Sequence, residues 1–157
     1  MERFILNLQE AERLIQIADH MTYITYPLIK EKNILLKILT ETKKAVANCI
    51  NSILQYEYFY KQITLYNNPK TNLETFIKKS SKRFQITELE IKQIQELFEL
   101  AEKHKQSPME FTQNEKVIIM TENSETYELS LEKAKLFVSL SKNILQKTKN
   151  KIFLDEK

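Results

Sequence analysis

The chain has 157 residues, of which 42% are hydrophobic and 29% are charged, and it contains no glycine. This length and composition fit one globular domain, and a net charge of +3, carried mostly by lysine, permits nucleic-acid binding without predicting it. The absence of glycine excludes the Gly-rich loops that hold dinucleotides and nucleoside triphosphates, the G-x-S-x-G nucleophile elbow and the EF-hand calcium loop.

The cysteine and the histidines predict no metal site. Cys49 falls within a helical apolar pattern, which indicates a buried structural thiol. His20 and His104 lack the Glu-x-x-His spacing of di-iron bundles, and zinc needs three or four ligands. We therefore expect no metal and no cofactor. No signal peptide and no transmembrane stretch is recognisable, so we expect a cytoplasmic protein without membrane contact.

Two long helices are predicted in the first half of the chain. Residues 3–25 carry apolar side chains at helical spacing, and Pro27 is expected to interrupt this helix. Residues 28–66 carry an apolar seam that alternates by four and three residues. This seam predicts a helix of about 39 residues, nearly 60 Å long at about 1.5 Å per residue, with a surface that a second chain could share.

Three capping boxes punctuate the middle of the chain. Thr71–Glu74 and Thr87–Glu90 each predict a helix start, and the helix after Thr87 is expected to end near Lys103–Lys105. Ser107–Glu110 predicts about one further turn of helix.

The pattern then changes from helix to strand. Residues 116–121 and 126–129 alternate or are β-branched around a polar loop, which predicts a β-hairpin over about 115–129. Ser130 is expected to cap the last helix, and the tail 150–157 is expected to fray. The predicted fold is mainly α: a single domain over 1–157, a bundle of four main helices with a long second helix and a small β-hairpin before the last helix.

One pair of residues suggests catalysis. Arg13 and His20 stand seven positions apart, two turns along one face of the first helix. An arginine can stabilise a developing phosphorane while a histidine moves a proton. The spacing resembles the R-x(4–6)-H motif of HEPN-domain ribonucleases, which are helical bundles that often dimerise. In that family the motif lies late in the domain, whereas here it lies on the first helix. The alternative is a surface arginine and a partly buried histidine.

Two further patterns suggest binding. Tyr56, Tyr58 and Tyr60 form the densest aromatic run; they could pack in the core, form a protein interface or stack on bases. The basic run of Lys78, Lys79, Lys82 and Arg83 is the best candidate for phosphate contact, with a solvated helix end as the alternative.

These observations predict a non-enzymatic helical interaction module that self-associates or binds a protein partner through the long helix. The second hypothesis is an RNA- or DNA-associated protein that uses the basic run, with a HEPN-like ribonuclease as its enzymatic form. The helical outline is also similar to small helical proteins of archaeal genomes, and that likeness implies no activity.

Overall fold

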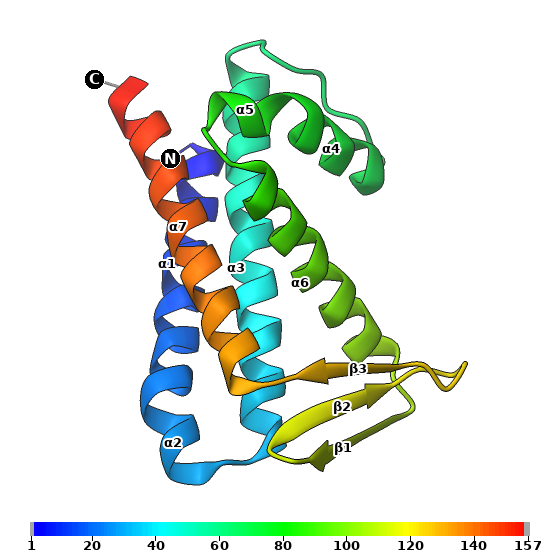
Figure 1. The fold of residues 1–157 in the computed structure, drawn as a ribbon. Helices are drawn as coiled ribbons and strands as arrows, with labels where there is room; N and C mark the ends of the chain where they lie inside the picture. Colours follow the sequence, from blue (N-terminus) through cyan, green and yellow to red (C-terminus); the bar gives the residue numbers. More distant parts are fainter. Residues whose placement is uncertain (1, 156–157) are drawn as a thin grey trace.

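The computed structural model describes residues 2–155, with side chains up to Leu154. Three helices lie side by side along their length: α1 (Arg3–His20), α3 (Lys32–Phe59) and α7 (Leu131–Asp155) (Figure 1). A fourth, α6 (Glu88–Gln106), diverges from them toward a small antiparallel sheet. The predicted fold class, a mainly helical bundle with β structure before the last helix, is confirmed.

Helix α3 forms the centre of the bundle, but it is shorter than predicted. It ends at Phe59 after 28 residues, whereas the sequence predicted a helix over 28–66. The predicted seam is real, and from Leu35 to Tyr56 its side chains are buried against other parts of the same chain. The helix ends where this cover ends, since an uncovered apolar turn gains little from staying helical.

The first helical segment runs past Pro27, where an interruption was predicted. Helix α1 continues through a π-helical turn, η1 (Met21–Thr25), into the short α2 (Tyr26–Ile29), and the chain leaves helical geometry at Lys30. A proline ring clashes with the carbonyl one turn back in a regular helix. The π-turn ends at Thr25, so Pro27 falls in the first turn of α2, where a proline is tolerated.

A short helical segment, residues 69–83, crosses the end of α3. It consists of α4 (Pro69–Thr75), the π-turn η2 (Phe76–Ser80) and α5 (Ser81–Arg83). Thr71 was predicted to cap α4, but the cap is Asn68, whose side chain accepts the backbone N–H groups of Lys70 and Thr71. Pro69 occupies the first turn, where its missing N–H has no intrahelical partner to lose.

The sheet has three strands instead of the predicted two. Strands β2 (Lys116–Met120) and β3 (Thr126–Leu129) form the predicted hairpin, and β1 (Met109–Gln113) pairs with the other edge of β2. The helical turn predicted at Ser107–Glu110 is wrong: the Ser107 hydroxyl oxygen lies 2.7 Å from the carbonyl oxygens of both Met109 and Met120 and fixes the entry to β1. The β1–β2 turn is hard to see in the sequence because its second residue is Glu115 and not glycine.

The last helix is also longer than predicted. Ser130 caps α7 through a hydrogen bond from the Lys133 backbone N–H, as predicted. Residues 150–155, expected to fray, are helical, and the side chain of Ile152 is completely buried. Burial of that turn outweighs the tendency of a helix end to fray. The remaining tail residues, 156 and 157, lie outside the described part of the chain.

Two residues with left-handed backbone conformation flank the short helical segment, one after α3 and one after α5. Lys61 (φ 60°) follows α3 and Gln85 (φ 59°) follows α5. After each of them a backbone N–H returns to the helix, from Gln62 to Glu57 and from Ile86 to Ser81. This is the Schellman arrangement, in which glycine is the usual residue because it carries no Cβ. Lys61 and Gln85 both carry a Cβ, so each bears the steric cost of the left-handed conformation.

The substitution Gln85→Gly is expected to raise the free energy of unfolding by about 1 kcal/mol, since glycine removes the Cβ clash of the left-handed conformation. Urea denaturation measures this change. As a control, Lys92→Gly on the exposed face of α6 is expected to lower stability by about 1 kcal/mol. A loss of stability in Gln85→Gly would contradict the backbone explanation.

Candidate functional site

The structure brings two of the sequence-predicted segments together at one end of the bundle. The aromatic run lies at the C-terminal end of α3, and the basic run lies on η2 and α5, which cross that end (Figure 1). Arg83 donates hydrogen bonds of 2.6–3.0 Å from Nε and Nη2 to both carboxylate oxygens of Glu57. Glu57 and Arg83, 26 positions apart in the chain, are thus in direct contact, and we call the exposed residues next to them the aromatic–basic end (Tyr58–Tyr60 with Lys78–Lys82).

The aromatic residues divide into a buried anchor and an exposed group. Tyr56 is buried, and its ring meets those of Phe4 and Phe84 edge-on at 5.3 and 6.1 Å. It therefore belongs to the core, the first of the alternatives for this run. The next aromatic residues are exposed, by 51% for Tyr58, 57% for Phe59 and 44% for Tyr60. Phe59, whose spacing in the sequence predicts a core position, is the most exposed of the three.

The basic residues also divide into two kinds. Lys78 and Lys79 on η2 and Lys82 on α5 are exposed, and none of them has an ion-pair partner within the described chain. Arg83 differs, because the carboxylate that it holds is only 2% exposed. The hydrogen bonds to Glu57 raise the pKa of the Arg83 guanidinium and fix it in place. The three lysines remain available to an external anion, and Arg83 anchors the segment that carries them.

The local backbone here is irregular. Lys78 and Lys79 lie on a π-turn, a geometry found frequently at functional sites. The same turn contains Ser80, whose hydroxyl oxygen is buried without a hydrogen-bond partner among residues 2–155. Buried polar atoms are nearly always paired, so such an atom requires an explanation. The sequence signal for this irregularity is weak, because π-turns have no simple residue pattern.

Arg13 and His20 are not brought together by the structure. Both are exposed on α1, and Arg13 binds Glu10 through Nε and Nη2 at 3.0 and 2.6 Å. Hydrogen bonding within this pair raises the pKa of Arg13 and lowers that of Glu10. In the described part of the chain no contact joins Arg13 to His20. A catalytic role for the two residues remains a prediction.

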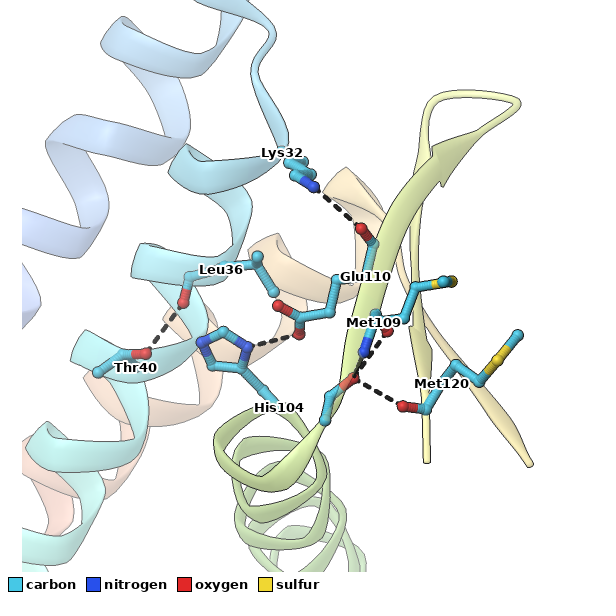
Figure 2. A network of polar contacts seen from close by, with 8 residues as sticks. Lys32, Leu36, Thr40, His104, Met109, Glu110 and Met120 are labelled. Atoms are coloured by element: carbon cyan, nitrogen blue, oxygen red, sulfur yellow. Dashed lines mark hydrogen bonds and ion pairs between the residues drawn. The ribbon is translucent and has the colours of Figure 1, made fainter. Parts of the chain in front are cut away.

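A histidine–carboxylate pair that the sequence did not reveal lies at the other end of α6. His104 Nδ1 is 2.6 Å from Glu110 Oε2, and Figure 2 shows the ring between β1 and the Leu36–Thr40 turn of α3. Lys32 Nζ donates to the backbone carbonyl of Glu110 at 2.9 Å. Together these contacts hold the edge strand against the helices. The sequence misses the pair because Glu110 was assigned to a helix.

The remaining described part of the chain offers neither a reactive thiol nor a metal site. Burial raises the pKa of the Cys49 thiol to about 12, so this cysteine stays protonated inside the core. Within residues 2–154 no three His, Cys, Asp or Glu side chains are grouped so that they could hold a metal ion. None of the helices described is both long and apolar enough to cross a bilayer.

Comparison with models of known protein families, with curated proteins and with solved structures found no match for this chain. The resemblance to HEPN ribonucleases therefore rests on the spacing of Arg13 and His20 and on the helical outline.

The substitution Arg83→Met is expected to lower the free energy of unfolding by about 3 kcal/mol, because it leaves the Glu57 carboxylate buried without a counter-charge. Urea denaturation at pH 7 measures the loss. Adding Glu57→Gln to Arg83→Met should restore part of it, and Lys82→Met, the neighbouring change on α5, should leave stability within about 0.5 kcal/mol. Equal effects of the Lys82 and Arg83 changes would contradict the anchoring role of Arg83.

Proposed function

We propose that the protein binds single-stranded nucleic acid at the aromatic–basic end. The observation that carries this proposal is that three exposed aromatic side chains, Tyr58, Phe59 and Tyr60, end a helix against which η2 and Arg83 pack. These neighbouring elements carry three exposed lysines that lack ion-pair partners in the described chain. Sequence-tolerant binders of single strands combine these two elements: aromatic rings stack on the bases, and cations line the path of the backbone.

The charge of this region favours a polyanion over a protein. Residues 58–86 contain six basic side chains and one acidic one. Lysine is depleted in protein–protein interfaces, whereas it contacts phosphates readily as a mobile point charge. A single strand also suits exposed rings better than a duplex, whose bases are already stacked on one another.

The interaction-module hypothesis loses part of its support, since the apolar seam of α3 is used within the chain. Self-association and binding to a protein partner remain predictions.

The first test neutralises the lysines together, as Lys78→Gln, Lys79→Gln and Lys82→Gln in one variant. Binding of a fluorescently labelled single-stranded RNA is followed by anisotropy between 50 and 200 mM salt. We expect weaker binding and a salt slope about 2 smaller in magnitude, since each lost phosphate contact removes about 0.7 from the slope for a single strand.

The matched control carries the same charge change elsewhere, as Lys37→Gln, Lys92→Gln and Lys105→Gln, all three exposed. It is expected to bind nearly as the natural chain does. Equal weakening in both variants would mean that only the net charge matters and would contradict a defined site. Binding that ignores salt altogether would also contradict the proposal.

The second test removes a stacking surface. Tyr58→Ala is expected to weaken RNA binding by about 5- to 150-fold, the equivalent of about 1–3 kcal/mol for one stacked base, with the salt slope unchanged. Tyr23→Ala is the control, since Tyr23 is 49% exposed on the π-turn η1, between α1 and α2. Equal affinities of the two variants would count against stacking at the aromatic–basic end.

A further inference from the structure

An apolar groove opens beside the aromatic–basic end, between α3, α4 and α6. It has a volume of about 340 Å³ and is lined by Ile50 and Leu54 of α3, Leu73 of α4 and Phe98 of α6. Leu65 closes it from the loop that follows the aromatic run. This volume falls at the small end of ligand pockets, which span about 300–1,000 Å³, so the groove suits one small ring system.

Asn72 fixes the loop that closes one side of the groove. The Asn72 side chain accepts the Tyr66 backbone N–H at 2.9 Å and donates to the Tyr66 carbonyl at 2.8 Å. Because both halves of this amide are used, the loop carrying Leu65 is held against α4. The groove is therefore built by specific contacts and is not merely a gap between helices.

Two other amides at the groove have no such partner. Asn51 and Gln55 stand one turn apart on α3, and within the described chain neither side-chain amide makes a hydrogen bond. Gln55 is half-buried, so its unpaired donor and acceptor face a site that is only partly wet. A side-chain amide presents a donor and an acceptor next to each other, which matches the N6 and N7 edge of adenine.

Positive charge flanks the apolar walls. Lys43 Nζ lies 5.8 Å from the centre of the Phe98 ring, and the exposed Lys70 follows Pro69, which lines the groove. The groove suits a nucleotide. Its base would lie flat between the apolar walls with its edge at an amide, and its phosphate would lie near the cations outside.

We propose that this groove binds a single nucleobase, with adenine as the best match, while Lys43 and Lys70 face the attached phosphates. The proposal rests on the proposed function, since α4 leads directly into η2 and its lysines. A strand held at the aromatic–basic end would place one unstacked base in the groove. The groove would then add base preference to an otherwise sequence-tolerant site.

The direct test uses adenosine 5′-monophosphate as the probe on methyl-labelled protein. We expect saturable NMR shifts of the Ile50, Leu54, Leu65 and Leu73 methyl groups, since a bound purine exerts a ring-current effect on its walls. Ribose 5-phosphate, which lacks the base, should leave these methyl groups unmoved. Equal shifts with the two probes, or shifts confined to other parts of the molecule, would overturn the proposal.

Two variants test the walls and the edge separately. Ala47→Tyr fills the groove and should abolish the shifts. Gln55→Leu keeps the walls and removes an amide, and it should weaken binding of the mononucleotide at least about fivefold. Gln16→Leu, an exposed change on α1, is the control. If Gln55→Leu binds the mononucleotide with unchanged affinity, the groove recognises only apolar surface, and its assignment to a base is overturned.

The two proposals can fail independently. If RNA binds with the expected salt slope but Ala47→Tyr binds adenine-rich and uracil-rich strands exactly as the natural chain does, the groove proposal is wrong and the proposed function stands. If no RNA binds and the mononucleotide still shifts the four methyl groups, the proposed function is wrong and the groove binds a free nucleotide.

Discussion

Helix α3 is buried around more than half of its circumference, and the rest of the structure depends on covering it. Besides the seam residues Leu39 and Ile53, its buried positions include Ala45 on one side of the seam and Leu36 and Leu54 on the other. Each large apolar side chain gains about 1.5–3 kcal/mol on full burial, so one neighbouring helix is not enough. Helices α1, α6 and α7, the π-turn η2 and strand β2 all pack against it.

The candidate site lies at the C-terminal end of α3, which its neighbouring elements no longer cover. Glu57 is the last deeply buried residue of α3, and the three aromatic residues that follow it are exposed. A buried carboxylate is tolerated only with a counter-charge, and Arg83 of α5 supplies one from the short helical segment that crosses the end of α3. The ion pair thereby holds the segment that carries the lysines of η2 and α5 against the end of α3. The interaction that satisfies the core is also the one that assembles the proposed binding surface.

The lysines lie in two kinds of surroundings that composition alone does not separate. On α7, Lys142 and Lys149 pair with Asp19 and Glu12 of α1, and Lys133 and Lys147 pair with Glu96 and Glu90 of α6. Burial alone would raise the pKa of Glu90, but the hydrogen bonds from Lys147 and Thr87 outweigh it and the pKa is lowered. These pairs align α7 with its neighbours. The lysines of the basic run have no such partners in the described chain, and the proposed function uses them for phosphate contact.

The sequence by itself determined the helical class, the buried seam of α3, the caps at Thr87 and Ser130 and the central hairpin, because periodicity and capping are local properties of the chain. It did not reveal strand β1, since the left-handed turn at Asn114 and Glu115 forms without glycine and pairing with β2 outweighs the local helix signal. It overestimated α3, because the helix ends where tertiary cover ends. The joining of Tyr58–Tyr60 to Lys78–Lys82, the pairing of His104 with Glu110 and the amide-edged groove were decided only by the tertiary structure, since each unites residues whose separation along the chain carries no periodic signal.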